Sequence, residues 1–238
     1  MEPDAPLARL AQDPATAAIL LDVDGTLAPI VSQPEDARVP ADTQTVLADL
    51  VARYALVACL SGRPAADAAR IVAVDGVRYV GEHGLELDPA AGQWVERLAA
   101  FARSANWPHE EGKRLSLSFH YREAADEAAA RSELERIADR ARREGLRPRW
   151  GRKVLEIRPP LESDKGSAVR RLVAEAGVQR ALYAGDDATD LDAFAGLDEL
   201  ETGVRVAVLS DETPPALVEA ADISVDGPEA LVDLLRTL

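Results

Sequence analysis

Short apolar runs alternate with helical patterns along most of the chain, and this alternation restricts the possible folds more than any other feature. Buried strands are predicted at 18–23, 55–60, 76–80, 181–185 and 204–209. Helices are predicted at 41–53, 64–72, 165–176, 188–196 and 228–237. Strands that alternate with helices form a parallel sheet with helices on both faces. We therefore predict an α/β fold with a Rossmann-like core, in which ligands bind where the strands end at one edge of the sheet.

The middle of the chain departs from this alternation. A half-exposed strand is predicted at 114–121, followed by a helix that ends at Gly145 and then by two short strands around Gly151. Apolar residues recur at helical spacing in that helix: Ala130, Leu134, Ile137 and Ala141. This pattern predicts a smaller α+β domain at 104–163, inserted into a core made of residues 1–103 and 164–238.

The charge of the chain limits the partners that it can bind. The formal net charge is -15, with 27 Lys and Arg against 42 Asp and Glu. Segment 104–163 is nearly balanced, with 13 Lys and Arg against 11 Asp and Glu. Because nucleic acids and anionic membranes bind basic surfaces, we expect neither as a partner. The middle segment is the part expected to hold an anionic ligand, although most of its charges are also explained by a solvated helix face.

Cysteine use and hydropathy predict where the protein works. Cys59 is the only cysteine, so no intramolecular disulfide can form, and it lies in an apolar run. No apolar stretch reaches the ~18 residues that span a bilayer, and the N-terminus lacks the pattern of a secretory signal. We predict a cytoplasmic protein, and a monomer is the default expectation.

The first chemical motif is Asp22-Val-Asp24-Gly25-Thr26-Leu27, directly after a predicted strand. Two carboxylates two residues apart can face one cavity once the chain turns, and a glycine permits that turn. One carboxylate can act as a nucleophile, and the other can act as general acid and then as general base. A set of strand-terminal acids or a calcium loop is the alternative.

Two further motifs follow strands or open helices. Ser61-Gly62-Arg63 lies at a strand-to-helix turn, where a hydroxyl and backbone N–H groups can hold a phosphate; an ordinary helix cap is the alternative. Lys165 opens a helix and can stabilise charge on a phosphoryl group, although most lysines are simply solvated.

The fourth motif is Gly185-Asp186-Asp187-Ala188-Thr189-Asp190, again directly after an apolar strand. Three acids at one strand end are costly unless a cation is present, and helix capping explains only one of them. Hard oxygen ligands beside a phosphate site favour Mg²⁺ over zinc. All four motifs belong to one predicted sheet, which makes a chance combination improbable.

With these four motifs the chain resembles the haloacid dehalogenase superfamily of phosphatases. The resemblance implies that Asp22 is the nucleophile and a Mg²⁺ ligand. It also implies that Asp24 is the acid/base and that the backbone carbonyl of Asp24 binds the metal. Asp186, Asp187 and Asp190 are implied in or next to the metal shell. The residues expected around the phosphate are Asp22, Thr26, Ser61, Gly62, Arg63 and Lys165.

Within that superfamily the chain is similar to the trehalose-6-phosphate phosphatases. The similarity rests on DVDGTLAPI, on Gly81-Glu82-His83-Gly84, on GDDATDLDAF and on two strings of the middle segment, EGK…SFHYR and GRKVLEIRP. It implies that Glu82, His83 and Gly84 contact substrate from the core. In the inserted domain it implies sugar-binding roles for Glu111, Lys113, Arg122, Arg152 and Glu156, with Arg152 where the family has lysine.

The resemblance implies Mg²⁺-dependent hydrolysis of trehalose 6-phosphate, with a small-molecule sugar phosphate as the partner. The nearest alternative is a related phosphatase for glucosyl-3-phosphoglycerate or sucrose 6-phosphate. A non-catalytic phosphosugar-binding protein is less favoured because the set of chemical residues is intact. A dehalogenase needs no metal, so the cluster Asp186–Asp190 argues against it.

Overall fold

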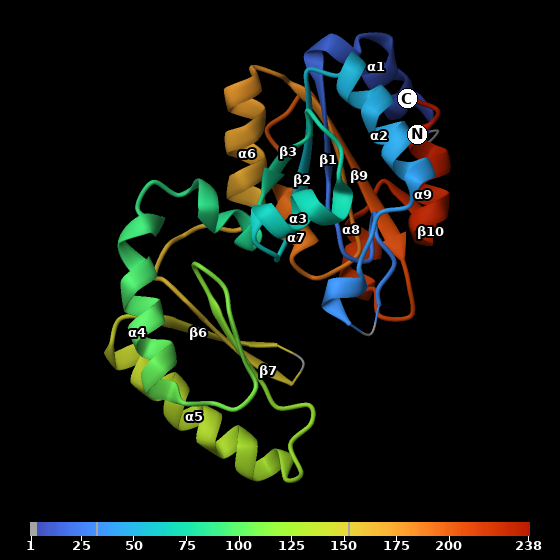
Figure 1. Cartoon of the computed structure of the whole chain (residues 1–238). Helices are drawn as coiled ribbons and strands as arrows, with labels where there is room; N and C mark the ends of the chain where they lie inside the picture. Colours follow the sequence, from blue (N-terminus) through green and yellow to red (C-terminus); the bar gives the residue numbers. More distant parts are fainter. Residues whose placement is uncertain (1–3, 32, 152) are drawn as a thin grey trace. The chain divides into compact units, whose positions relative to one another are not determined.

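The computed structural model describes residues 4–31, 33–151 and 153–238, and these form two compact units. The core unit comprises the described residues up to Gly84 and those from Ser163 onward, and the insert unit comprises Leu85–Glu162. Figure 1 shows the path of the chain through both units.

The core unit is built on a six-stranded parallel sheet with the order β10-β9-β8-β1-β2-β3. Its strands are β1 (Ala17–Leu21), β2 (Leu56–Leu60), β3 (Arg78–Val80), β8 (Arg180–Gly185), β9 (Thr202–Leu209) and β10 (Ile223–Asp226). Ala18 pairs with Leu56 of β2, and Ala17 pairs with Arg180 of β8. The predicted parallel sheet is therefore confirmed, and its strands all end at one edge.

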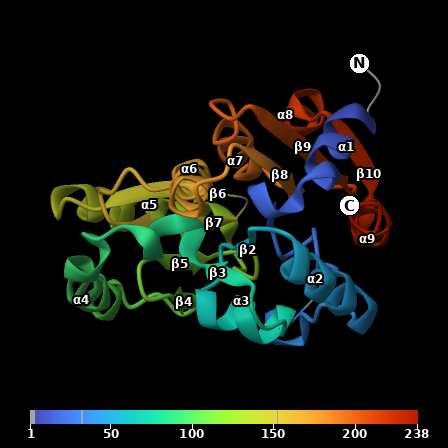
Figure 2. The ribbon, with the colours of Figure 1, turned by 90° about the horizontal axis from the view of Figure 1, so that it is seen from above.

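Helices cover both faces of this sheet, as Figure 2 shows when the sheet is seen nearly end on. Apolar residues of one face form a single buried cluster with four helices, α1 (Asp4–Gln12), α2 (Ala41–Arg53), α3 (Ala65–Val72) and α9 (Gly227–Leu235). The other face is covered by α6 (Lys165–Ala176) and α7 (Asp190–Ala195). Cys59 of β2 is completely buried in the first cluster, and burial raises the pKa of its thiol.

Three elements of the core unit lie outside the predicted ranges: α1, α8 (Pro215–Ala220) and β10. Each is short, and β10 is an edge strand in which the partly buried Ile223 and Val225 alternate with the exposed Ser224 and Asp226 over only four residues. Short elements carry too few periods of apolar residues to be recognised before their packing partners are known. Short 3-10 turns occur at Pro14–Thr16, Pro34–Asp36, Glu82–Leu87 and Ala91–Trp94.

The insert unit is a four-stranded antiparallel sheet with two helices on one face. The strand order is β4 (Glu110–Gly112), β5 (Leu117–His120), β7 (Val154–Arg158), β6 (Arg147–Gly151). The helices are α4 (Val95–Ala105) and α5 (Glu127–Arg143). Their apolar residues and those of the sheet form one buried cluster, which includes Leu98, Phe101, Leu117, Phe119, Leu134, Ile137, Leu155 and Ile157.

The insert unit starts earlier than predicted, because its first helix packs on its own sheet. The predicted boundary at residue 104 would have left α4 in the core, whereas Leu98 and Phe101 of α4 are buried in the insert cluster. The start at Leu85 therefore replaces the predicted start. None of the helices in the described part of the chain combines the length and apolar composition that a bilayer crossing requires.

The assignment of α4 to the insert unit predicts that Phe101→Ala destabilises that unit. Removing a buried phenylalanine should lower the free energy of unfolding by about 3–5 kcal/mol, because it leaves a cavity in the cluster. All three tryptophans, Trp94, Trp107 and Trp150, lie in the insert unit, so tryptophan fluorescence during urea unfolding reports on it. The control is Glu96→Ala on the exposed side of α4, with an expected change within about 0.5 kcal/mol. An unchanged tryptophan transition in Phe101→Ala would contradict the assignment.

Candidate active site

A buried lysine joins two buried carboxylates at the carboxyl edge of the core sheet. Lys165 Nζ lies 2.6 Å from Asp22 Oδ1 and 2.6 Å from Asp190 Oδ1. The lysine side chain is only 2% exposed, so both contacts are made away from water. Burial lowers the pKa of Lys165, but the carboxylates of Asp190 and Asp22 outweigh burial and raise the pKa above its ordinary value. Lys165 is therefore a fixed positive charge.

The start of α6 fixes the position of this lysine. Asp164 is the N-cap: its Oδ1 accepts a hydrogen bond from the backbone N–H of Ser167 at 2.7 Å, and Ser167 Oγ accepts one from the N–H of Asp164 at 2.9 Å. This reciprocal capping box sets where the helix begins. Lys165 is thus held at the first helical position.

The loop after β1 brings the two acids of the first motif to the same edge. Asp22 directly follows β1, and its backbone N–H donates to the carbonyl of Ala184 at 2.9 Å. Gly25 has φ +86°, and a Cβ on it would lie 2.1 Å from Asp186 Oδ2, so only glycine fits this turn. Thr26 Oγ1 donates to Asp186 Oδ1 at 3.1 Å, so the predicted phosphate-binding hydroxyl is used to hold another acid.

Asp190 is fully occupied by hydrogen bonds. Its Oδ1 accepts from Lys165 and, at 2.7 Å, from the hydroxyl of Tyr183. Its Oδ2 accepts from the backbone N–H groups of Asp186 at 2.9 Å and Asp187 at 3.0 Å. A carboxylate has about four lone-pair sites, and these four donors fill them. Asp190 was predicted in or next to the metal shell, and its hydrogen bonds also make it a holder of Lys165 and of the loop Asp186–Asp187.

The electrostatics of the acids differ from one to the next. Burial raises the pKa of Asp22 well above its ordinary value although Lys165 opposes this, and burial likewise raises the pKa of Asp190. Burial and the carboxylates of Asp190 and Asp187 raise the pKa of Asp186 to about 7. Burial would raise the pKa of Asp187 too, but Lys165 and hydrogen bonds from Thr189 outweigh it and lower that pKa.

This donor set fits a divalent cation. Within the described residues, Asp22, Asp186 and Asp190 each offer a carboxylate oxygen, and these oxygens lie within 4.8 Å of one another. With Asp190 filled, Asp22 and Asp186 are the acids suited to hold a metal, since Lys165 and Thr26 each engage only Oδ1 of the acid they contact. Buried carboxylates that outnumber their nearest cation favour a hard divalent ion. Burial, together with this excess of carboxylates, also raises the pKa of Asp186.

The Ser61-Gly62-Arg63 loop follows β2, as predicted, but its arginine contacts an acid. Ser61 Oγ accepts from the backbone N–H of Arg63 at 3.1 Å. Arg63 Nε and Nη2 donate to the carboxylate of Asp24 at 2.7 to 3.0 Å. Asp24, predicted as the acid/base, is therefore held by a residue that was predicted to bind phosphate.

The turn Glu82-His83-Gly84 is bound to this loop by its backbone. The N–H of His83 donates to the carbonyl of Ser61, and the N–H of Glu82 donates to the carbonyl of Arg63, each at 2.9 Å. All three residues of the turn have positive φ, 49° for Glu82, 55° for His83 and 96° for Gly84. Consecutive left-handed residues are uncommon, and such backbone clusters at functional sites. Glu82 is also almost completely buried.

The predicted sugar-binding residues of the insert unit lie largely on one sheet face. Ser118 and Glu156 alternate with core residues of β5 and β7, so they occupy the face opposite α4 and α5. Glu111 pairs with Ser118 in register and lies 3.9 Å from Lys113 and 3.2 Å from His120. The structure therefore brings Glu111 and Lys113 together and places Glu156 on the same polar face.

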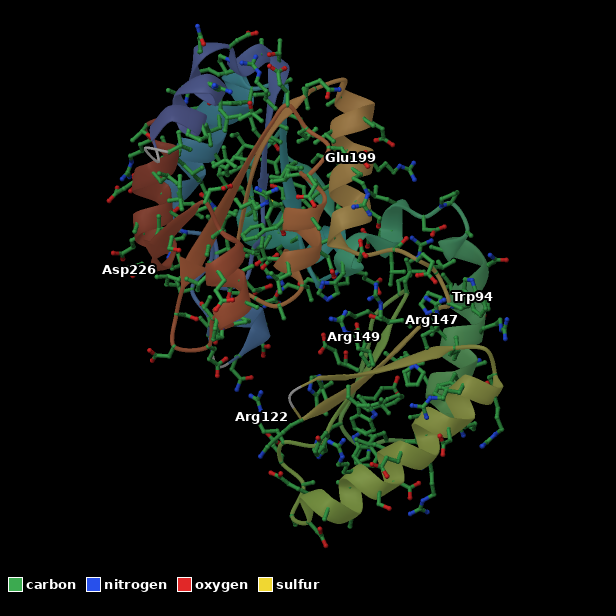
Figure 3. The ribbon with its side chains drawn as sticks, turned by 180° about the vertical axis from the view of Figure 1, so that it is seen from behind. Trp94, Arg122, Arg147, Arg149, Glu199 and Asp226 are labelled. Carbon is green, nitrogen blue, oxygen red and sulfur yellow. The ribbon has the colours of Figure 1, made fainter. Side chains whose placement is uncertain are left out.

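Two other predicted residues do not extend this face. Arg122 is exposed in the turn after β5, at the end of the sheet (Figure 3). Arg152 lies outside the described residues. Arg149, which no motif indicated, pairs with Glu156 in register and stands on the polar face, because its neighbour Trp150 packs on the insert cluster (Figure 3).

Sequence reasoning missed the role of Tyr183. It lies within an apolar run and looks like an ordinary core residue, yet its hydroxyl donates to Asp190. Tyr183 lies within β8, where its ring is completely buried and its hydroxyl reaches Asp190. An aromatic residue with a hydroxyl two residues before Gly185 was the only available hint.

The chain is similar in sequence to known proteins. A family model described as trehalose-phosphatase matches residues 20–228. A trehalose-phosphate phosphatase of Mycobacterium marinum is 36% identical over 217 residues, which are 82% of this chain and 54% of that protein. The chain thus spans about half the length of the first curated relatives that it matches.

Solved structures resemble most of the chain. A trehalose-6-phosphate phosphatase related protein aligns with a TM-score of 0.71 and 26% identity, covering 92% of this chain and 96% of that chain. A haloacid dehalogenase-like hydrolase from Bacteroides thetaiotaomicron aligns with a TM-score of 0.65 and 14% identity, covering 93% of this chain and 98% of that chain. The second likeness shows the fold alone, and it confirms the predicted haloacid dehalogenase fold.

The raised pKa of Asp186 predicts that divalent metal binding weakens at low pH. With a pKa of about 7, most of this carboxyl is protonated at pH 6 and ionised at pH 8. Because a metal binds the ionised form, the apparent Mg²⁺ affinity should be about tenfold lower at pH 6 than at pH 8. Calorimetric titration with Mg²⁺ at both pH values measures this ratio. A Mg²⁺ affinity that does not change between them would contradict the assignment of Asp186 as a ligand.

The same shift makes Asp186 a destabilising group in the metal-free protein. The folded-state pKa lies above the ordinary value of 3.8, so this contribution to stability decreases as pH rises from about 4 to about 7. The Asp186→Asn variant, which cannot ionise, should lose this part of the pH dependence of thermal unfolding measured without metal.

The contacts of Lys165 predict a large effect of Lys165→Met. Removing the ammonium leaves Asp22 and Asp190 buried without their cation, which should lower the free energy of unfolding by about 3–5 kcal/mol. Urea unfolding followed by circular dichroism measures this change, with Lys113→Met as the control because Lys113 lies in the other unit and is less buried. Equal effects of the two substitutions would show that Lys165 has no special structural role.

Proposed function

The chain belongs to the trehalose-phosphatase family, and from that premise we propose that it is a phosphatase that hydrolyses trehalose 6-phosphate to trehalose and phosphate. The observation that carries this proposal is the contact of one buried ammonium, Lys165, with Asp22 at the end of β1 and with Asp190 at the start of α7. A carboxylate that is buried, oriented and neutralised on one side is suited to attack an anionic phosphate.

Asp22 is the nucleophile in the first step. One of its carboxylate oxygens bonds to phosphorus while the bond from phosphorus to the sugar oxygen breaks, which gives an aspartyl phosphate. Lys165 decreases the repulsion between the carboxylate of Asp22 and the phosphate. Ser61, which directly follows β2, donates a hydrogen bond from its hydroxyl to a phosphoryl oxygen. Both cation and carboxylate are fixed before substrate arrives, so little reorganisation is required.

Asp24 moves the proton in both steps. It gives a proton to the leaving sugar oxygen when the phosphorus–oxygen bond breaks. It then accepts a proton from the water that attacks the phosphorus of the aspartyl phosphate, which releases phosphate and restores Asp22. The two acids are two positions apart after one strand, so each can reach its side of the phosphorus.

We propose Mg²⁺ as the metal, held by Asp22 and Asp186, with Asp187 beside them. When bound, Mg²⁺ neutralises charge on the phosphoryl oxygens and on the ionised acids. Asp190 contributes by holding Lys165 and the backbone of the loop, rather than by ligating the metal.

The substrate assignment is supported by the polar face of the insert unit. Glu111, Lys113 and Glu156 offer carboxylates and a cation, which suit the dense hydroxyl groups of a disaccharide. Their roles, together with those of Arg122 and Arg152, and of Glu82, His83 and Gly84 in the core unit, remain part of the proposal. The single buried cysteine is consistent with the predicted cytoplasmic location.

The proposal predicts which substitution abolishes turnover. Asp22→Asn should decrease phosphate release by at least about 10⁴-fold, the scale expected when the nucleophile of a covalent mechanism is removed. Asp67→Asn is the matched control and should leave turnover unchanged, because Asp67 is a half-exposed acid on α3. Release is measured with trehalose 6-phosphate, sucrose 6-phosphate and glucosyl-3-phosphoglycerate, with and without Mg²⁺.

Each outcome of this experiment separates one part of the proposal from another. A Mg²⁺-dependent preference for trehalose 6-phosphate supports both the chemistry and the substrate. Preference for another sugar phosphate keeps Asp22 as nucleophile and replaces the substrate. Activity that survives in Asp22→Asn would refute the mechanism, and no release from any substrate by folded wild-type protein would favour a binding protein.

A further inference from the structure

The guanidinium of Arg63 donates hydrogen bonds to both oxygens of the Asp24 carboxylate. Arg63 Nε donates to Oδ1 at 3.0 Å and to Oδ2 at 2.8 Å, and Nη2 donates to Oδ1 at 2.7 Å. Oδ1 thus receives two donors and Oδ2 receives one. Charge-assisted bonds to a planar guanidinium fix the orientation of a carboxylate more strongly than a single ammonium could.

The backbone of Arg63 is fixed in turn by its neighbours. Its N–H donates to Ser61 Oγ at 3.1 Å, and its carbonyl accepts from the N–H of Glu82 at 2.9 Å. A Cβ on Gly62 would lie 2.7 Å from the ring of His83, so the loop and the turn Glu82-His83-Gly84 are packed closely against each other. The left-handed backbone of that turn is therefore connected to Asp24 through one arginine.

We propose that Arg63 is a positioning residue for the acid/base Asp24, and that the turn Glu82-His83-Gly84 holds Arg63 in place for this purpose. The inference rests on the proposed function and deepens it. Since Oδ1 has two donors among the described contacts, Oδ2 is the oxygen that carries the proton. It passes that proton to the leaving oxygen in the first step and takes one from water in the second.

This assignment differs from the one that the motif suggested, in which Arg63 binds phosphate. A phosphate ligand should matter equally for every phosphate ester. A residue that positions the general acid should matter most when the leaving oxygen needs a proton. Alkyl phosphates such as sugar phosphates need one, whereas p-nitrophenyl phosphate does not, because its leaving group is already a stable anion.

The test is Arg63→Gln assayed with trehalose 6-phosphate and with p-nitrophenyl phosphate. Misplacing a catalytic group by about 1 Å costs on the order of 10²-fold, so we expect kcat for the sugar phosphate to decrease by about 30- to 100-fold. We expect kcat for p-nitrophenyl phosphate to decrease by less than about threefold, since general acid catalysis contributes little there. Arg63→Lys keeps the positive charge but loses the planar guanidinium. Its kcat for the sugar phosphate should lie between those of Arg63→Gln and wild type.

Arg205→Gln is the matched control. Arg205 also bonds two ways to acids of the core unit, Asp198 at 2.7 Å and Asp222 at 3.4 Å. Its side chain is 24% exposed, against 21% for Arg63, so the two substitutions remove similar ion pairs. Arg205→Gln should change neither rate. If Arg63→Gln does not fold, as judged by circular dichroism, Arg63→Lys alone gives the comparison of the two substrates.

A double substitution gives an independent readout. In an Asp24→Asn background, Arg63→Gln should cost less than about twofold further, because there is no acid left to position. Equal losses on both substrates, or a full additional loss in the Asp24→Asn background, would show that Arg63 acts on the phosphate and overturn the inference alone. If wild type prefers another sugar phosphate, that ester replaces trehalose 6-phosphate in the same comparison. A wild-type protein that releases phosphate from neither class of ester would overturn the proposed function and the inference with it.

Discussion

The active site depends on one buried ammonium. Lys165 lies between two carboxylates from different elements, and its charge opposes the effect of burial, which raises the pKa of both acids. Its contacts connect the first turn of α6, the end of β1 and the first turn of α7. These ion pairs therefore join three elements that lie far apart in the sequence.

The acids of the site divide into those that hold the structure and those that are left for chemistry. The carboxylate of Asp190 accepts hydrogen bonds from Lys165, from Tyr183 and from two backbone N–H groups, which fill its lone pairs. This filled acid fixes the loop on which Asp186 stands, and the pKa of Asp186 is raised because it is buried and because other carboxylates surround it. Asp190 thus fixes the position of Asp186, and the negative charge of Asp186 is not balanced unless a cation binds.

The sequence was sufficient for the parallel sheet and for the meeting of the four motifs, because apolar runs and strand-terminal acids are local signals. It could not assign the partners of long side chains. The partner of Arg63 depends on the conformation of its long side chain in the folded protein. The role of Asp190 depends on a hydrogen bond from Tyr183, and the apolar run around Tyr183 does not indicate that bond. The side on which α4 packs likewise depends on Phe101 finding a cluster formed by strands that come later in the chain. Such long-range contacts are properties of the folded chain and have no local pattern.

The burial of Cys59 has a practical consequence. It is the only cysteine in the chain, it lies in the core cluster, and its raised pKa keeps the thiol protonated. Thiol-reactive dyes and spin labels therefore have no native target in the folded protein. Two cysteines introduced on exposed positions, one in each unit, would carry a label pair free of background. The wild-type chain is in this respect already prepared for measuring distances between its two units during turnover.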